Sequence, residues 1–293
     1  MAVSHEIQYF LGANSPTGFY SLYSELLPPE TASVIYILKG GPGCGKSTLM
    51  RQVAQQAAQA GETVEYILCS ADPDSLDAVV LPRLGAALVD GTAPHVVEPK
   101  YPGAVEQYVN LGDCYDRAGL RAIRGEILTC MDGYKEHYQR AYRCLTAAAQ
   151  IGEDLRSLLL TPALEAKMAK RARGILSREV KKGDGEAGRA VQRFLGGVTW
   201  KGVLCQFETV DALCKRVYEL ADTYGLAHSM LTHLAAGALA SGHDVIVCPS
   251  PLFPDRMEHL LIPSLSLAFV SAPPSLPYPK RPYRRIRLDA MAD

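Results

Sequence analysis

A glycine-rich loop near the N-terminus has the residue types and the spacing that phosphate chemistry requires. Residues 40–48 fit the pattern G-x-x-x-x-G-K-[ST]. Glycines let such a loop wrap so that its backbone N–H groups point at phosphate oxygens. We expect Lys46 to reach the β- and γ-phosphates of a nucleotide and Ser47 to offer its hydroxyl to Mg²⁺. The predicted phosphate-binding loop, or P-loop, consists of Gly40, Gly41, Pro42, Gly43, Cys44, Gly45, Lys46, Ser47 and Thr48.

The segments on either side of this loop have the periodicity that the motif needs. The apolar, β-branched run at residues 34–38 predicts a buried strand, and residues 47–60 predict a helix that Gly61 ends. The start of that helix directs the positive end of its dipole at the same anion. Further strands are expected over residues 64–68 and 86–89, with a helix over 73–81. This alternation predicts a mostly parallel α/β sheet.

A carboxylate at the end of a neighbouring strand should hold the metal shell of the nucleotide. Asp90 follows the predicted strand 86–89 and is our preferred candidate, although an aspartate before glycine is also common in turns. The rivals are Asp72 and Asp74, with Asp77 nearby, after the preceding strand. Helix capping explains Asp72 or Asp74 equally well. The predicted catalytic pair is therefore Lys46 and Asp90, with Ser47 and Asp90 as the Mg²⁺ ligands.

The motifs that the sequence lacks reduce the number of reaction classes to consider. Asp90 is followed by glycine, so the strand-end Asp-Glu pair of many fast ATPases is absent. The Asn-Lys-x-Asp motif of GTPases and the Leu-Ser-Gly-Gly-Gln motif of ABC ATPases are also absent. These absences favour a small-molecule or nucleotide kinase, or a slow regulatory ATPase, with ATP and Mg²⁺ as cofactors.

Kinases of this class bring arginines from a helical lid onto the transferred phosphoryl group. A predicted helical segment over about residues 102–182 contains several arginines, although a solvated helix face explains any single one better. The loop after Asp90 adds two weaker candidates for contact with phosphates or substrate. These residues are Arg121, Arg124, Arg140, Arg143, His95 and Lys100.

The second half of the chain repeats the first. Phe10-Leu11-Gly12 is echoed at residues 194–196, and the spacing of apolar, glycine and proline positions returns from residue 194 to residue 270. Two strand–helix–strand units can share apolar spacing by chance, but the paired Phe-Leu-Gly and Pro-Asp matches favour an internal duplication. We therefore predict a P-loop NTPase domain over residues 1–190, a polar linker at 181–188 and a degenerate repeat over 191–293.

The second repeat keeps the apolar positions of the first and loses its chemical groups. Ala227 and His228 align with the last glycine and the lysine of the loop, and Ser271 aligns with Asp90. Asp222 adds a negative charge where a phosphate would bind. We expect this repeat to be structural or regulatory and to bind no nucleotide.

Composition sets limits on the remaining classes. The 293 residues are 48% hydrophobic and carry a net charge of −1, which suits a globular protein with no strong field for nucleic acid or anionic membrane. Eight scattered cysteines and the absence of an export signal or apolar span favour a cytoplasmic protein. The basic tail at residues 280–287 is compatible with nucleic acid, but a solvated tail is the commoner explanation.

Several stretches of the chain resemble a bacterial family of tandem-repeat P-loop proteins. They are FLGANSPTGFYSLYSEL, ILKGGPGCGKSTLM, CSADPDSLD, DGTAPHVVEPKYPGAV and GHDVIVCPSPLFPDRMEHLLIP. The family is known as ATPases or nucleotide kinases, and the resemblance implies a cytoplasmic ATP-binding protein with duplicated P-loop domains. Its second repeat commonly keeps a P-loop, which this sequence lacks.

These observations lead to two hypotheses. The first is an enzyme that binds MgATP at a single site in its N-terminal half and either hydrolyses it or transfers its phosphoryl group to an acceptor. The second is a nucleotide-gated interaction protein, in which the bound nucleotide sets a surface for a protein partner and ATP turnover is incidental.

Overall fold

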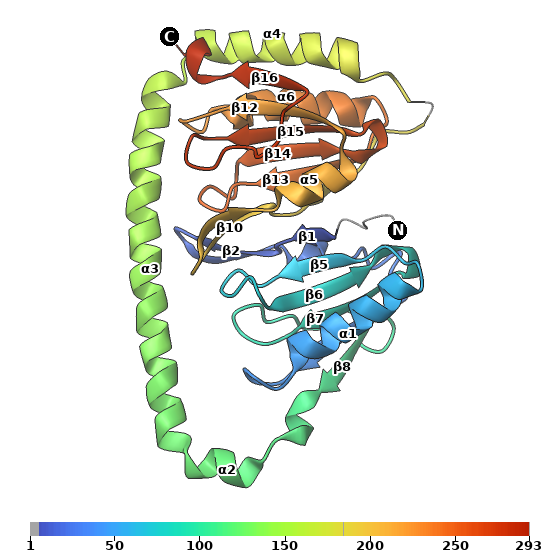
Figure 1. The fold of residues 1–293 in the computed structure, drawn as a ribbon, viewed down its shortest axis with the longest axis vertical. Coiled ribbons are helices and arrows are strands. Elements are labelled where there is room, and N and C mark those ends of the chain that lie inside the picture. The colour runs from blue at the N-terminus through green and yellow to red at the C-terminus, as the bar shows by residue number, and fades with distance from the viewer. Residues whose placement is uncertain (1–5, 184, 293) are drawn as a thin grey trace. The chain divides into compact units, whose positions relative to one another are not determined.

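A computed structural model of the chain describes residues 6–183 and 185–292. Within these residues the fold is mixed α/β, with two six-stranded sheets and six α-helices (Figure 1). The strand order is β1-β5-β6-β7-β4-β8 in the first sheet and β9-β13-β14-β15-β12-β16 in the second. The two orders match strand for strand, which confirms that the fold is a duplicated arrangement.

The first sheet is built around β4 (Val34–Lys39), which pairs in parallel with β7 (Ala86–Asp90) and β8 (Glu106–Asn110). Next to β7 lies β6 (Leu76–Leu81), which is antiparallel to both β7 and β5 (Glu65–Leu68). The edge strand is β1 (Ile7–Tyr9). Helix α1 (Lys46–Gln59) packs against β6 (Figure 1). The predicted strands and the helix after the glycine loop are therefore confirmed.

The second sheet repeats this plan with β12 (Arg216–Ala221) in the place of β4. It contains β9 (Ala190–Gln192), β13 (Val245–Pro249), β14 (Met257–Ile262), β15 (Leu267–Ala272) and β16 (Arg284–Arg287). Helix α6 (Ala227–Ala240) packs on β14 as α1 packs on β6. Matching hairpins, β2 (Gly12–Ser15) with β3 (Gly18–Ser21) and β10 (Gly196–Thr199) with β11 (Gly202–Cys205), precede both halves.

Two predicted elements are wrong. The helix expected over residues 73–81 is the strand β6, whose six residues are all buried. Because β6 runs against β5 and β7, the sheet is mixed rather than mostly parallel. The helical segment expected over about residues 102–182 begins with the strand β8, whose polar sequence EQYVN suits an edge of the sheet.

Helices fill the rest of that segment. They are α2 (Arg117–Ala122), α3 (Arg124–Leu159) and α4 (Pro162–Glu179), and a shorter α5 (Phe207–Leu213) follows β11. The chain divides into two compact units. One unit is Phe10–Thr146, and the other consists of the described residues before Phe10 and after Thr146. The 36 residues of α3 belong partly to each unit. None of the described helices combines the length and the apolarity that crossing a membrane requires.

Apolar packing around the second sheet explains why the second repeat keeps the fold of the first. Met168 and Ile175 of α4 are fully buried beside Leu231 and Leu234 of α6, and Phe269 of β15 lies in the same cluster. Burial of apolar area on this scale stabilises the repeat whether or not its loop carries functional groups. The apolar positions can therefore persist after the chemical groups have changed.

Candidate functional site

The candidate site lies at the end of the first sheet where several strands finish. Because β4, β5 and β7 run in the same direction, their C-terminal ends meet at this end of the sheet, and the antiparallel β6 begins there. Leu38 and Asp90 are register partners on the adjacent strands β4 and β7. The chain turns directly from the end of β4 into the glycine loop, residues 40–48. Ligands of open α/β sheets bind at such carboxyl ends.

The backbone of the glycine loop requires glycine at two positions. Gly43 and Gly45 have φ angles of +76° and +89°, which favour a residue without a Cβ. Gly45 directly precedes α1, so no side chain caps the first turn of that helix. The N–H groups of such a turn, together with the helix dipole, favour a bound anion. Pro42, Cys44 and Thr48 lie in the same turn, between β4 and the first residues of α1.

Lys46 and Asp90 form an ion pair at the floor of this loop. Their Nζ and Oδ2 atoms are 3.4 Å apart, and only 9% and 13% of the two side chains is exposed. Lys46 Nζ also donates to the carbonyls of Gly40 at 2.6 Å and Gly41 at 2.9 Å. Asp90 Oδ1 accepts from the N–H and the hydroxyl of Thr92, at 2.8 and 2.5 Å. The carboxylate is therefore held in place with its second oxygen facing the lysine.

The hydroxyl of Ser47 is fixed at the same end of the sheet. Its Oγ accepts a hydrogen bond from the N–H of Leu76 at 3.0 Å, which ties the first turn of α1 to the start of β6. Asp90 and Ser47 offer carboxylate and hydroxyl oxygens, the hard ligands that Mg²⁺ prefers. These residues fit the cation that the sequence implies.

The rival carboxylates serve the turn before β6. Asp72 accepts from the hydroxyl of Ser75 at 2.8 Å and from the N–H of Asp74 at 3.3 Å. The carbonyl of Asp74 accepts from the Arg51 guanidinium of α1. The carboxylate of Asp72 and the backbone of Asp74 thus shape a turn, where the sequence had suggested either a metal ligand or a helix cap.

Sequence reasoning missed one residue that contacts the glycine loop. Tyr115 follows β8 and the short turn after it, and its hydroxyl accepts a hydrogen bond from the N–H of Gly41. That N–H is one of the groups that a P-loop directs at phosphate. No motif marks Tyr115, because the pairing of β8 beside β4 is what carries it to the loop.

The weaker candidates lie elsewhere. His95 is buried beside Asp77, with 3.2 Å between its Nε2 and Asp77 Oδ2. The backbone N–H of Lys100 donates to Glu106 at 3.4 Å. The four candidate arginines of the helical segment are exposed on α2 and α3; they are Arg121, Arg124, Arg140 and Arg143.

The equivalent loop of the second repeat contains an internal anion. Asp222 is 3% exposed, and its carboxylate accepts from the N–H groups of Leu226 at 2.7 Å and Ala227 at 2.8 Å. It therefore bonds the backbone at the start of α6, whereas the first repeat has Gly40 at the aligned position. Ser271 donates to the same carboxylate at 3.4 Å. His228 Nδ1 accepts from the N–H of Met257 at 3.0 Å, and burial lowers the pKa of this histidine, so it carries no lysine-like charge.

Glu258 beside this loop is expected to make stability depend on pH. Burial, with the nearby Asp222 charge, raises the pKa of Glu258 to about 7. The folded protein then holds a proton that the unfolded chain releases, so this group's stabilising contribution is lost as the pH rises through about 7. The stability of Glu258→Gln relative to that of wild type should therefore increase as the pH rises over this range. Urea denaturation at several pH values gives the free energy of unfolding of both proteins. A difference between the two free energies that does not change with pH would contradict the assignment.

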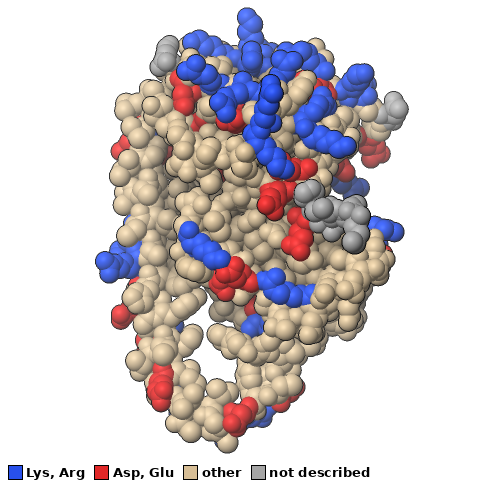
Figure 2. Space-filling model, viewed as in Figure 1, with Lys and Arg blue, Asp and Glu red and all other residues tan. Residues whose placement is uncertain are grey.

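The basic tail is part of the second sheet. Figure 2 shows Lys and Arg side chains gathered over α4 and β16. Arg285 of β16 pairs with Glu219 at 2.9 Å, and Lys280 pairs with Asp211 at 2.7 Å. The end of the segment is therefore an edge strand, and its basic side chains stay largely exposed, as a solvated segment would have them.

Comparisons with known proteins give one partial match. The family model described as Nephrocystin 3, N-terminal, matches residues 21–83, which are 63 of the 293 residues. The matched stretch contains the glycine loop, α1, β5 and β6. No curated protein and no solved structure matches the chain. The chain is thus similar to the Nephrocystin 3 N-terminal family over about a fifth of its length.

Proposed function

We propose that the glycine loop is a P-loop that binds MgATP, and that the protein hydrolyses ATP or transfers its phosphoryl group at this single site. The observation that carries the proposal is the Lys46–Asp90 pair, which joins the first residue of the uncapped helix α1 to the last residue of β7. A cation, a carboxylate and open N–H groups at one sheet edge suit a nucleotide phosphate chain with its metal.

Each side chain has a role in this proposal. Lys46 would exchange its bonds to the Gly40 and Gly41 carbonyls for bonds to phosphate oxygens. Ser47 and Asp90 would hold Mg²⁺, which neutralises charge on the phosphates. Thr92 keeps Asp90 in one orientation through two hydrogen bonds. The resemblance to bacterial tandem-repeat P-loop proteins supports the same reading and leaves the phosphate acceptor open.

Acceptor-dependent ADP release tests the reaction class. Purified protein with MgATP is incubated with a panel of nucleoside monophosphates and small alcohols. A kinase releases more ADP when its acceptor is present, whereas an ATPase gives the same rate with every member of the panel. Absence of both ATP binding and turnover would contradict the proposal.

Asp90→Asn should keep much of the nucleotide affinity and lose the Mg²⁺-dependent turnover. The amide preserves the shape of the side chain and removes the charge that holds the metal shell. Turnover is measured against Mg²⁺ concentration, with nucleotide binding followed separately. Asp72→Asn and Asp74→Asn serve as matched controls on the neighbouring turn. If one of these controls shows the phenotype and Asp90→Asn does not, the metal ligand is at the start of β6.

A second candidate function is a nucleotide-gated interaction, and two observations favour it. Tyr115 contacts the glycine loop and leads directly into α2. Helices α2 and α3 then expose large apolar side chains, with exposed fractions from 38% to 53%; they are Leu120, Ile123, Ile127, Leu128 and Met131. A phosphate that takes the Gly41 N–H would release Tyr115 and so change the segment that carries this apolar surface.

Basal ATP hydrolysis that changes only when a protein partner is added would favour this second function over the kinase. Tyr115→Phe removes the hydroxyl that accepts from Gly41 and keeps the ring. If the protein is nucleotide-gated, Tyr115→Phe should bind the partner without nucleotide. If the protein is a kinase, ADP release by this variant should still depend on the acceptor.

A further inference from the structure

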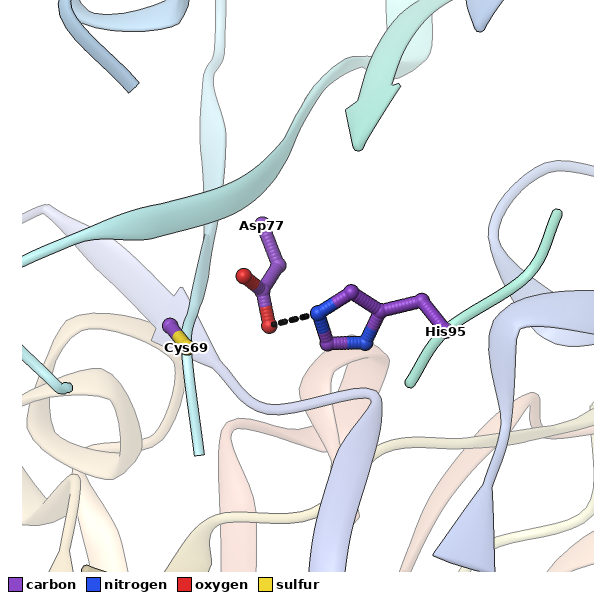
Figure 3. Close-up of side chains that lie close together, drawn as sticks. All are labelled: Cys69, Asp77 and His95. Carbon is purple, nitrogen blue, oxygen red and sulfur yellow. Dashed lines mark ion pairs between the residues drawn. The ribbon is translucent and has the colours of Figure 1, made fainter. Parts of the chain in front are cut away.

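Three potential metal ligands come together in the unit Phe10–Thr146, apart from the Lys46–Asp90 pair. Cys69 follows β5, Asp77 lies on β6 and His95 lies in the loop after β7 (Figure 3). Their ligand atoms, the Cys69 Sγ, an Asp77 carboxylate oxygen and a His95 ring nitrogen, all lie within 4.8 Å of one another. His95 Nε2 is 3.2 Å from Asp77 Oδ2. The turn between β5 and β6 brings Cys69 close to Asp77, and the loop after β7 brings His95 to both.

Aromatic side chains hold the His95 ring so that Nε2 faces the other two ligands. The ring packs edge-on against Phe19, with centroids 5.2 Å apart, and against Tyr23 at 4.9 Å. Among the residues that the structure describes, His95 Nδ1 is buried without a hydrogen-bond partner, so the polar contact of the ring is made through Nε2. Packing, rather than a second hydrogen bond, therefore orients this histidine.

Asp77 is oriented by a hydrogen bond from outside the triad. The hydroxyl of Tyr23 donates to Asp77 Oδ2 at 3.0 Å. Such outer hydrogen bonds to a ligating carboxylate are typical of metal sites, where they fix the ligand in one position. The side chains of Asp77 and His95 are 5% and 6% exposed, so both polar groups lie in an environment that strengthens binding of a cation.

Cys69 in this setting is a protonated thiol. Burial, with the nearby Asp77, raises its pKa to about 12, so the residue is a poor nucleophile without a cation. A divalent metal that binds the sulfur displaces that proton and compensates the buried carboxylate at the same time. The cluster is thus better suited to holding a metal than to covalent catalysis by cysteine.

We propose that Cys69, Asp77 and His95 bind one Zn²⁺ ion. A set of one sulfur, one nitrogen and one oxygen suits this borderline-soft cation, and tetrahedral coordination places ligand atoms about 3–4 Å apart. On binding, the Cys69 S–H bond breaks, its sulfur forms the bond to zinc and one proton leaves to solvent. The proton on His95 Nε2 moves to Nδ1. Three protein ligands leave the fourth position to water.

A cavity reaches the cluster at His95, on the side of one of its three ligands. It has a volume of about 440 Å³, and Tyr23, His95, Lys100 and Glu106 are among the residues that line it. An entry path is one of the features that a built metal site needs. The same cavity would admit a small molecule to the open fourth position.

The second repeat does not keep these three ligands at the equivalent positions, and its Cys205, His259 and Glu258 are outside the group of close ligand atoms found among the described residues. Ser250 and Glu258 occupy the positions of Cys69 and Asp77, and residues 273–283, after β15, contain no histidine. Only the carboxylate persists. The proposal therefore expects one metal ion per chain, bound in the first repeat without any nucleotide.

Titration of the metal-free full chain with Co²⁺ tests the proposal, because cobalt replaces zinc and gives an absorption band from its bond to thiolate. Wild type should develop this band at one Co²⁺ per chain, release about one proton per ion and lose the band when Zn²⁺ is added. Cys69→Ser and His95→Gln should lose the band or weaken cobalt binding at least tenfold, with the circular dichroism of wild type.

The matched control is Cys214→Ser in the second repeat. Burial also raises the pKa of Cys214 to about 12, but its thiol faces the carbonyl of Leu267 and no metal cluster. This variant should keep the full band. No thiolate band in wild type, a full band in Cys69→Ser, or loss of the band in Cys214→Ser would each overturn the assignment. None of these measurements uses nucleotide, so they are independent of the proposed ATP site.

Discussion

Lys46→Ala is expected to weaken MgATP binding roughly 10- to 100-fold and to reduce turnover at least as much. The ammonium group would make charge-assisted bonds to the β- and γ-phosphates, and such bonds contribute about 1.5–3 kcal/mol each. The fold should survive, because the lysine contacts two loop carbonyls and Asp90 rather than the apolar core. Titration calorimetry with a non-hydrolysable ATP analogue measures the affinity.

Lys39→Ala provides the matched control. Lys39 lies at the end of β4, before the glycine loop, but its ammonium donates to the carbonyls of Gly91 and Val97 and pairs with Glu98 at 2.8 Å. Its loss should leave most of the nucleotide affinity. Equal affinity in wild type and a folded Lys46→Ala protein would sink the P-loop assignment, and an equal loss in both lysine variants would show that the effect is not specific to the loop.

The second large effect concerns stoichiometry, since we expect one nucleotide per chain. In the second repeat, the N–H groups of Leu226 and Ala227 already donate to the Asp222 carboxylate. His228 supplies no positive charge and Ser271 supplies no metal carboxylate. Each missing interaction is worth on the order of 1–3 kcal/mol, so their sum places a second site beyond detection at cellular ATP.

Calorimetry of wild type and Lys46→Ala decides the number of sites. One site in wild type and none detectable in the variant is the expected pair of results. Two sites in wild type, or a site of unchanged affinity in a folded Lys46→Ala protein, would mean that the second repeat still binds nucleotide.

The sequence was most informative where a segment has one buried face or a motif with a fixed spacing. The strand at residues 34–38, the glycine loop and the helix after it have both, and the structure places them as expected. The duplication was also readable, because repeated prolines and glycines mark turns that require those residues. Pro82 and Pro263, for example, begin the same short 3₁₀ turn in each half.

Other elements could not be predicted because their local patterns are ambiguous. Strand β6 reads LDAVVL and is buried along its whole length, so it lacks the alternation that separates a strand from a helix. Strand β8 is polar because it lies at the edge of the sheet, where few side chains face a core. In both cases the neighbouring strands, and not the local sequence, determine the structure.

The same limit applies to the side chains of the sites. Lys46 and Asp90 were each predicted as site residues because a motif marks the first and a strand end marks the second, and the structure brings them into an ion pair that the sequence did not predict. Cys69, Asp77 and His95 have no such spacing, and the antiparallel course of β6 brings them together. Tyr115 reaches the loop only because β8 pairs with β4.

The buried carboxylate of Asp222 is a ligand that the second repeat supplies to itself. Because it is covalently attached to the chain, its effective concentration at the start of α6 does not fall when the protein is diluted or when nucleotide is depleted. A free anion has to displace this carboxylate, and the loss of translational and rotational entropy on association opposes its binding. The second repeat thus stays permanently in the anion-bound state of its loop, while the same state of the first repeat would follow the supply of nucleotide.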